Sequence, residues 1–274
     1  RAEGLTAQAP AHDNPPDPER TLRVGYVSAD LREHPVASFV EPLLAWHDAK
    51  EFDITCYASH ARDDAQTERL RALAHHWRSV ADLSDEQLAA RIREDRIDLL
   101  IDLSGHTYGN RLLTFAHRPA PLQFTYLGFP ASTGMTAMDY RLTDANLDPP
   151  GDGDACYSEK NLRLPQSLWC FRPLGEFADP APTPALRRGH VTFGSFNGFH
   201  KIHPSLLETW ARLLAGIPGS RLLMITVPEG QTVADWLASA RYAVTQWLAV
   251  TAAVGGSPTN APGSAGFRAL LGLR

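Results

Sequence analysis

The sequence predicts an α/β protein built on a doubly wound, mostly parallel sheet, and two observations support this. Short apolar runs rich in β-branched and aromatic residues alternate with segments of helical spacing, which is the pattern of βαβ crossovers. The runs are also nearly all apolar, as expected for strands that helices cover on both faces. Strands are expected at Leu22–Ser28, Phe52–Ala58, Ile97–Asp102 and Leu122–Tyr126, with a short fifth strand at Tyr140–Asp144.

Helices are expected between these strands. Apolar residues at helical spacing predict helices over residues 38–47, 67–77 and 84–95. Pro35 is placed to open the first of them, because proline is well accommodated in a first helical turn. Ser84 is expected to cap the third, since two acidic residues follow it directly.

Composition divides the chain into five segments. We expect a disordered leader over residues 1–20, an N-terminal lobe over 21–177, a proline-spaced linker over 178–185, the start of a second lobe over 186–235 and an atypical tail over 236–274. The second lobe shows one strand, one helix and one further strand, which cannot bury both faces of a sheet alone. We therefore expect this lobe to be truncated.

The tail has an unusual composition. From Trp236 to Arg274 it contains no Asp, Glu or Lys, and it shows neither a helical nor a strand period. A flexible linker would have such a composition, and so would an out-of-frame translation of a GC-rich gene. In either case we expect the tail to be irregular or loosely helical rather than a continuation of the second lobe.

Charge and cysteine content exclude several classes of protein. The 26 Lys and Arg residues against 31 Asp and Glu residues give a net charge of −5, which argues against a nucleic-acid partner or an anionic membrane surface. The three cysteines form no Cys-x-x-Cys motif, so neither a disulfide framework nor a cysteine-rich zinc site is expected. The first twenty residues are unlike a signal peptide and no run is long enough to span a bilayer, so we expect a cytoplasmic protein.

Common nucleotide and hydrolase motifs are missing from the sequence. No G-x-G-x-x-G follows the first strand, and there is no Walker A sequence or G-x-S-x-G elbow. Two histidine pairs, His75 with His76 and His200 with His203, lack a third ligand nearby. We interpret them as surface histidines and expect no metal site.

The loop after the first strand carries Asp30 and His34. In open α/β sheets, ligands bind beyond the carboxyl ends of the strands. A carboxylate four residues before an imidazole can orient the ring and raise its basicity. The alternative is that Asp30 caps a turn and His34 is merely exposed.

Two further strand-end loops carry small and polar residues. The loop after the third strand contains His106 and Thr107, and the loop after the fourth contains Gly128 and Pro130. Together with the first loop they would line one crevice, where glycines let a polar ligand approach backbone N–H groups. The alternative is that the small residues only make short turns.

The start of the second lobe offers a candidate diphosphate site. Asn197 and Lys201 follow its first strand, close to the N-terminus of the next helix. A lysine beside a helix N-terminus suits a diphosphate, since both attract anions. A solvated surface lysine is the alternative.

Long motifs in a fixed order resemble the catalytic region of the O-GlcNAc transferase/SPINDLY family, which is glycosyltransferase family 41. They are LRVGYVSADLREHP, IDLLIDLSGHTYGNRLLTFAHRPAPLQFTYLGFPASTG, MDYRLTD, CYSEKNLRLP and FGSFNGFHKIHPSLLETWARLLAGIPGSRLLMI, and the resemblance covers roughly residues 21–227. It implies a GT-B fold of two Rossmann-like lobes, of which the second is incomplete here. It also implies transfer of a sugar from a nucleotide diphosphate to Ser or Thr hydroxyls of proteins, without an essential metal, in a full-length protein that carries tetratricopeptide repeats.

The resemblance also implies roles for individual residues. Asp30 and His34 match the motif beside the sugar and the acceptor, and are the candidates for proton handling. His106 and Thr107 belong to the acceptor side of the cleft. The candidates for binding the donor are Leu127, Gly128, Pro130, Asn197 and Lys201, of which Lys201 matches the lysine that contacts the diphosphate.

The donor and the activity of this chain stay open at the sequence level. Val36 stands where the GlcNAc-using branch has Thr, and Gly198 where it has Gln, so these residues do not decide the sugar. The resemblance as a whole favours UDP-GlcNAc, and GDP-fucose, which SPINDLY-type members use, is the alternative. Nothing resembling the family's later His-Thr-Thr segment follows Val227. We therefore expect a weakly active or inactive chain, with a non-catalytic fragment or acceptor-binding module as the competing hypothesis.

Overall fold

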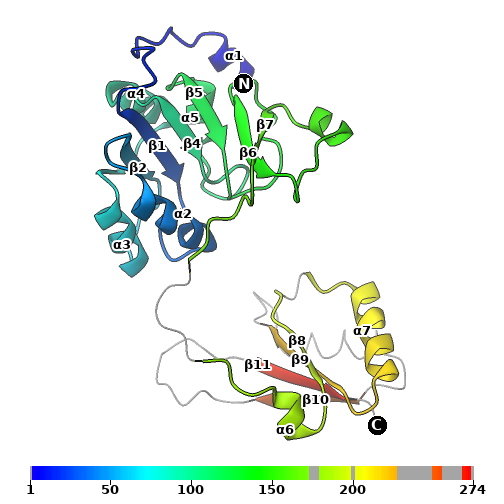
Figure 1. The fold of residues 1–274 in the computed structure, drawn as a ribbon. Coiled ribbons are helices and arrows are strands. Elements are labelled where there is room, and N and C mark those ends of the chain that lie inside the picture. Colours follow the sequence, from blue (N-terminus) through cyan, green and yellow to red (C-terminus); the bar gives the residue numbers. More distant parts are fainter. Residues whose placement is uncertain (1, 173–178, 199–200, 227–248, 255–266, 273–274) are drawn as a thin grey trace. The chain divides into compact units, whose positions relative to one another are not determined.

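The computed structural model describes residues 2–172, 179–198, 201–226, 249–254 and 267–272 (Figure 1). The chain forms two compact units, Arg1–Glu176 and Phe177–Arg274, and each is described by itself. The expected linker over residues 178–185 begins at the boundary, and its described part already contains the first turn of α6 (Pro184–Arg188).

Unit 1 alternates strands and helices, as the sequence predicts. Its elements are α1 (Ala2–Thr6), β1 (Leu22–Ser28), α2 (Pro35–Trp46), β2 (Phe52–Ala58), α3 (Ala65–Leu73), β3 (His76–Ser79), α4 (Asp85–Glu94), β4 (Leu99–Asp102), α5 (Leu112–Ala116), β5 (Leu122–Thr125), β6 (Tyr140–Asp144), the 3-10 turn Asp152–Cys156 and β7 (Lys160–Leu164).

The seven strands of unit 1 form one sheet in the order β3-β2-β1-β4-β5-β6-β7. Every neighbouring pair is parallel. The predicted doubly wound parallel sheet is therefore confirmed, with β1 and β2 at the predicted bounds. The chain moves outward from β1 to β3 and then returns to β4 on the other side of β1, so the direction of winding reverses between β1 and β4.

Helices cover both faces of this sheet, and each covered face holds its own apolar core (Figure 1). Side chains alternate between the faces along a strand, so Val24 and Tyr26 of β1 pack with α2 and α3 while Val27 packs on the opposite side. Leu88 and Ile92 of α4 belong to that opposite core. Coverage on both faces explains why the strand sequences are almost uniformly apolar.

The helix ends follow from local side-chain chemistry. Ser84 caps α4 in a capping box, in which its hydroxyl accepts from the Gln87 N–H at 3.2 Å and the Gln87 side chain accepts from the Ser84 N–H at 2.9 Å. Pro35 occupies the first turn of α2, and His34 is the N-cap. Both helix starts match the sequence prediction.

The edge strands β3 and β7 differ from the prediction. The helix expected over residues 67–77 ends at Leu73, and His76–Ser79 forms β3 beside β2. The His75 ring accepts from the Ile54 N–H at 2.9 Å, which fixes the chain alongside β2 just after the helix. Because β3 and β7 lie at the sheet edges and are mostly polar, they lack the apolar runs that identified the other strands.

Residues 2–20 differ from the expected disordered leader, because the structure packs them against the rest of unit 1. They begin with α1, which packs against α5. Asn14 and Arg20 both donate to the Asp98 carboxylate, at 2.7 and 2.6 Å. The segment lacks an apolar period, so its order comes from these polar contacts and from Ala2 and Leu5, which pack against one of the two apolar cores.

Unit 2 contains the strand-helix-strand unit that the sequence predicts. Strands β8 (Thr192–Ser195) and β9 (Arg221–Thr226) are parallel and are joined through α7 (Pro204–Gly216). Two more strands, β10 (Ala249–Val254) and β11 (Phe267–Gly272), complete the sheet order β10-β11-β9-β8, with antiparallel pairing of β11 to β9 and to β10.

The two added strands correct the expectation for the tail over residues 236–274. We expected no packing against the second lobe, yet β10 and β11 extend its sheet. The open edge of β9 offers backbone donors and acceptors, which an extended segment can satisfy without any side-chain period. The rest of the tail, like the end of the 186–235 segment, lies outside the described residues.

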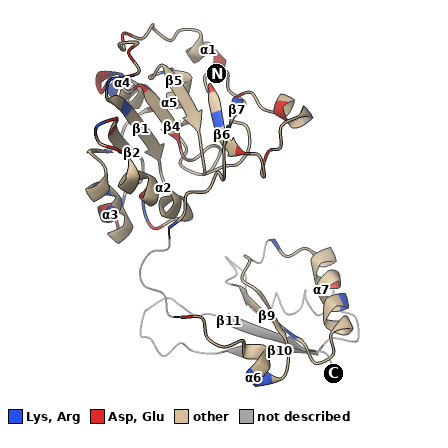
Figure 2. Cartoon of the chain, viewed as in Figure 1, with Lys and Arg blue, Asp and Glu red and all other residues tan. Residues whose placement is uncertain are grey.

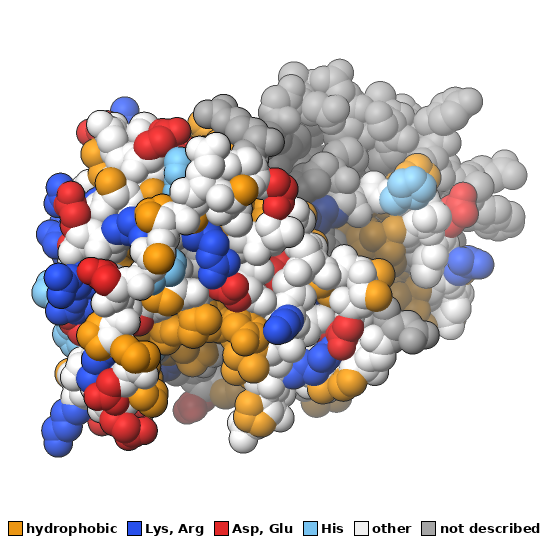
Figure 3. Space-filling view, turned by 90° about the horizontal axis from the view of Figure 1, so that it is seen from above, with side chains coloured by type: hydrophobic (Ala, Val, Ile, Leu, Met, Phe, Trp, Pro, Cys, Tyr) orange, Lys and Arg blue, Asp and Glu red, His pale blue; other side chains and the backbone are white. Residues whose placement is uncertain are grey.

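Charged side chains lie mainly on the helices and loops and are sparse on the central strands (Figure 2). On the face shown in Figure 3, basic and acidic side chains are interspersed and neither sign forms a continuous patch. Among the described residues, no helix is long and apolar enough to cross a membrane.

Candidate active site

The reversal of winding between β1 and β4 places two strand-end loops side by side. Asp30 and His34 follow β1, and His106 and Thr107 follow β4. The loop with Leu127, Gly128 and Pro130 follows β5, the next strand in the sheet. All three loops leave the carboxyl edge of one parallel sheet, where open α/β folds bind their ligands.

These loops touch one another directly. A Cβ atom placed on Gly109 would lie 2.9 Å from Cβ of Ala29, and one on Gly105 would lie 2.5 Å from Cβ of Phe129. The His106 ring meets the Phe129 ring edge-on at 5.7 Å between centroids. The structure thus brings His106, Thr107 and the Gly128 loop together, beside the loop that follows β1.

His34 combines a capping role with an exposed ring face. Its Nδ1 accepts from the Val36 N–H at 3.3 Å, and its side chain is 38% exposed. A backbone N–H can only donate, so neutral His34 carries its proton on Nε2. The Asp30 carboxylate lies 3.8 Å from the same Nδ1, too far for a hydrogen bond, so the expected orientation of the ring by Asp30 comes instead from Val36.

Asp30 itself is nearly buried at 6% exposure. Its backbone N–H donates to the Ser28 hydroxyl at 2.9 Å, which holds the turn at the end of β1. Asp30 therefore contributes a negative charge close to the His34 ring without a direct hydrogen bond to it.

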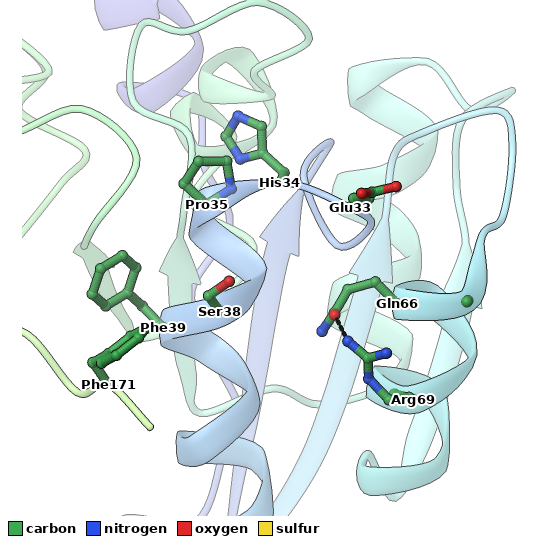
Figure 4. A pocket seen from close by; sticks show the side chains of 9 residues that line it. Glu33, His34, Pro35, Ser38, Phe39, Gln66, Arg69 and Phe171 are labelled. Carbon is green, nitrogen blue, oxygen red and sulfur yellow. Dashed lines mark hydrogen bonds between the residues drawn. The ribbon is translucent and has the colours of Figure 1, made fainter. Parts of the chain in front are cut away.

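A cavity of about 700 Å³ opens beside His34 on the outer surface of α2 (Figure 4). Phe39 and Phe171 lie on one side of it, and Gln66 and Arg69 from α3 lie on the other (Figure 4). The Phe39 and Phe171 rings are 5.7 Å apart between centroids. His34 thus lies at the rim of a space with an aromatic wall and a polar wall, and in the polar wall the Arg69 guanidinium is paired with Glu41 at 3.6 Å.

The loop after β4 is fixed by the buried carboxylate of Asp102, which ends that strand. It accepts from the N–H groups of Ser104 and Gly105 at 3.1 and 2.8 Å, and from the Thr125 hydroxyl at 3.0 Å. Burial raises the pKa of Asp102 to about 6, although these hydrogen bonds act in the opposite direction. Asp102 therefore ties the ends of β4 and β5 to the loop that carries His106.

Asp102 should make the stability of unit 1 depend measurably on pH. Its pKa is higher in the folded state than the ordinary value, so the folded chain binds the proton more tightly and loses stability as the pH rises. Relative to Asp102→Asn, we expect the wild-type free energy of unfolding to fall by about 2 kcal/mol between about pH 4 and pH 7. Urea unfolding of both proteins across this range measures the difference. Parallel stability curves would contradict the assignment.

The loop after β5 approaches the backbone of the loop after β4 closely. A Cβ atom on Gly128 would lie 2.1 Å from the Leu103 carbonyl oxygen. The preceding residue, Leu127, is buried and has a positive φ of 63°. This turn needs glycine at position 128 because only a hydrogen fits against the neighbouring backbone.

The donor residues expected in unit 2 lie after β8. Asn197 is exposed, donates to the Ser195 hydroxyl at 3.4 Å and lines a cavity of about 200 Å³ with Trp210 of α7. Lys201 is exposed, and its N–H donates to the Gly198 carbonyl at 3.0 Å. His203 caps α7 through its Nδ1, which accepts from the Ser205 N–H. The roles assigned to Asn197 and Lys201 stay predictions.

Two buried carboxylates that hold these loops, Asp102 at the end of β4 and Glu159 just before β7, were missed by the sequence analysis. Asp102 was counted as the end of a strand, and Glu159 was treated only as part of a motif. Both are less than 5% exposed and accept hydrogen bonds from residues of neighbouring loops. An acidic residue directly after an apolar run was the available signal for Asp102, whereas no local signal marks Glu159.

Among the described residues, no group of three or more His, Cys, Asp or Glu side chains could hold a metal ion.

The sheet order and the strand-end loops define unit 1 as a Rossmann-like α/β unit of the GT-B type. A family model described as "Glycosyl transferase family 41" matches residues 7–172. The chain belongs to glycosyl transferase family 41.

Several curated proteins and a solved structure are similar to the chain. Two are probable UDP-N-acetylglucosamine–peptide N-acetylglucosaminyltransferases called SPINDLY, from Petunia hybrida and Arabidopsis thaliana, each 41% identical over 82% of this chain and 25% of their own length. A lysine-to-methionine mutant of the Thermobaculum terrenum O-GlcNAc transferase superposes with a TM-score of 0.74 and 40% identity, over 86% of this chain and 44% of that one. The chain thus spans about a quarter of the length of the curated relatives it matches.

Proposed function

We propose that the full-length protein transfers a sugar, GlcNAc above all, from a nucleotide diphosphate to Ser or Thr hydroxyls of proteins. The observation that carries this proposal is the set of contacting loops after β1, β4 and β5, within a segment 41% identical to relatives named as peptide N-acetylglucosaminyltransferases. Unit 1 would contribute the acceptor side of the site and the loop that packs on the donor sugar.

The reaction joins the acceptor oxygen to the anomeric carbon of the sugar. The bond from that carbon to the diphosphate breaks, and the hydroxyl proton must leave. Neutral His34 presents Nε2–H, which suits donation of a hydrogen bond to a substrate oxygen. His34 would accept the hydroxyl proton on Nε2 only after giving up the proton already there, so the geometry favours an orienting role over that of the base.

Lys201 would stabilise the leaving diphosphate by its charge, which is the work a metal performs in other transferases. The N-terminus of α7 lies a few residues further along and adds a positive partial charge. GDP-fucose is the alternative donor, because Val36 and Gly198 stand where the GlcNAc-using branch has Thr and Gln.

The 274-residue chain alone should bind UDP or GDP only weakly. A charge-assisted hydrogen bond from Lys201 contributes about 1.5–3 kcal/mol. Millimolar to micromolar binding requires roughly 4–8 kcal/mol, which needs contacts to the base and the ribose as well. We expect calorimetry to give a dissociation constant above about 1 mM and no detectable transfer. Micromolar binding would contradict this prediction.

The proposed function is tested on the full-length protein. Radiolabelled UDP-GlcNAc and GDP-fucose are each incubated with a pool of Ser- and Thr-containing peptides, and label on peptide is counted. Label from UDP-GlcNAc supports the proposal, and label from GDP-fucose alone selects the alternative donor. Absence of label from both, with a folded protein, contradicts it.

A second candidate is an acceptor-binding module without catalysis. The family match covers residues 7–172, which lie within unit 1, and this favours it. Such a module would bind Ser- and Thr-containing peptides without nucleotide, and nucleotide would not change the affinity. Peptide titrations with and without UDP separate the two candidates.

We also propose that the protein is cytoplasmic. All three cysteines, Cys56, Cys156 and Cys170, are free thiols. Free thiols are typical of a reducing compartment.

A further inference from the structure

Glu159 is a buried carboxylate with a defined set of partners. It is 4% exposed and directly precedes β7. Its Oε1 accepts from the Thr133 N–H at 2.7 Å and from the Thr133 hydroxyl, and its Oε2 accepts from the Ser132 hydroxyl at 2.9 Å. In the described part of the chain, these side-chain partners all belong to the loop after β5.

The carboxylate also organises the loop beyond its direct partners. Ser132 Oγ, which donates to Glu159, accepts in turn from the N–H groups of Gly134 and Ser158 at 3.0 and 3.2 Å. The segment Ser132–Gly134 is thus folded around the Glu159 side chain and joined to the start of β7.

Glu159 is held in its charged form. Burial alone would raise the pKa of the Glu159 carboxyl, but hydrogen bonds from Thr133 and Ser132 outweigh burial and keep the pKa below its ordinary value. A buried charge is costly unless donors surround it. The loop can therefore move away from Glu159 only by leaving that charge without its donors.

The same loop connects Glu159 to His106. The Thr133 carbonyl oxygen lies 3.0 Å from Nε2 of His106. A carbonyl can only accept, so Nε2 carries the proton and neutral His106 keeps a free lone pair on Nδ1. Thr133 thus binds Glu159 through its N–H and hydroxyl, and fixes the tautomer of His106 through its carbonyl.

We propose that Glu159 is a positioning residue, which holds the loop Leu127–Gly134 and the His106 ring in the arrangement that receives the donor sugar. This inference rests on the proposed function, since Leu127, Gly128 and Pro130 would pack on that sugar. Glu159 acts through the loop and touches no reacting atom.

The test compares Glu159→Ala and Glu159→Gln with the wild type in the full-length protein. We expect Glu159→Ala to speed amide exchange across Leu127–Gly134 by about tenfold or more, because the loop loses its central acceptor. Nitrogen NMR should show a mixture of the two His106 tautomers in Glu159→Ala, where the wild type shows only one. With UDP-GlcNAc and GDP-fucose as probes, the KM for the donor should rise about tenfold while kcat stays within about threefold.

Glu159→Gln should restore only part of the exchange protection. Its amide oxygen can accept from Thr133, but Ser132 Oγ already accepts from the N–H groups of Gly134 and Ser158 and cannot also accept from the Gln NH₂. Lys160→Ala, an exposed change at the next residue, is the matched control and should behave as the wild type. If Glu159→Ala fails to fold, the glutamine variant and the wild type are compared by amide exchange across pH 3–7. The wild-type loop should be better protected at pH 7 and should approach the exchange rate of the glutamine variant in acid, whereas equal protection at pH 7 would overturn the positioning role.

The outcomes separate this inference from the proposed function. The positioning role would be overturned if Glu159→Ala had the same loop exchange and the same His106 tautomer as Lys160→Ala. An unchanged KM for the donor would also overturn it. If the wild type transfers neither sugar, the proposed function fails, and the exchange and tautomer measurements alone decide whether Glu159 positions the loop.

Discussion

Replacing Gly128 with alanine should destabilise unit 1 by about 3 kcal/mol or more, a large effect for one added methyl group. The new Cβ would lie 2.1 Å from the Leu103 carbonyl oxygen and 2.8 Å from Cα of Ser104. Both contacts are with backbone atoms, so no side-chain rotation can relieve them. The ends of β4 and β5 would have to separate, which would also disturb the hydrogen bond from Thr125 to Asp102.

Gly134→Ala is the matched control in the same loop. A Cβ atom added to Gly134 would have no neighbouring atom within 4 Å, but the φ of Gly134, +69°, lies in the left-handed region. We therefore expect it to cost only about 1–2 kcal/mol. Urea unfolding of the two variants measures both effects. Equal losses would contradict the larger cost that we expect from the close approach at Gly128.

Replacing His34 with alanine should lower kcat/KM for sugar transfer by the full-length protein about 100-fold or more, if the proposed function holds. The change removes the Nε2–H that the ring presents at the carboxyl end of β1. It also removes the N-cap of α2, which by itself costs about 1 kcal/mol of stability. With the alanine variant alone, a loss of activity from the missing imidazole could not be distinguished from one caused by the missing helix cap.

His34→Asn separates these two effects. The asparagine side-chain oxygen can accept from the Val36 N–H and so keep the cap, while the imidazole is lost. We expect His34→Asn to unfold at the wild-type urea concentration and still lose transfer to the same extent as His34→Ala. An active asparagine variant would mean that His34 serves the helix and not the reaction.

The central part of the fold could be predicted because its strands are buried on both faces. Leu22–Ser28 and Phe52–Ala58 are read directly from their apolar runs, and the structure gives them the same bounds. The edge strands could not be found in this way. His76–Ser79 and Lys160–Leu164 are stabilised by one neighbouring strand each, and their sequences alone do not indicate extended structure.

The loops of the candidate site could be predicted where glycine, histidine and hydroxyl residues follow a recognisable strand. The loops with His34, His106 and Gly128 were found in this way. Glu159 could not be found in this way, because its partners lie 26 and 27 residues earlier in the chain. Spacing along a sequence reveals local pairs such as Asp30 and His34, but here even that pair is not joined by a hydrogen bond.

The two edge strands of unit 1 have a consequence for its behaviour at high concentration. A free strand edge can pair with another molecule and start aggregation. Here β3 has only four residues and carries Arg78, while β7 carries Lys160 and Arg163. A second molecule that added a strand at either edge would have to bring its own backbone beside these cations. Arg78 and Arg163 also pair with Asp95 and Asp154, so both edges present charged side chains of either sign. Short, charged edges therefore favour solubility of the isolated sheet during expression and refolding.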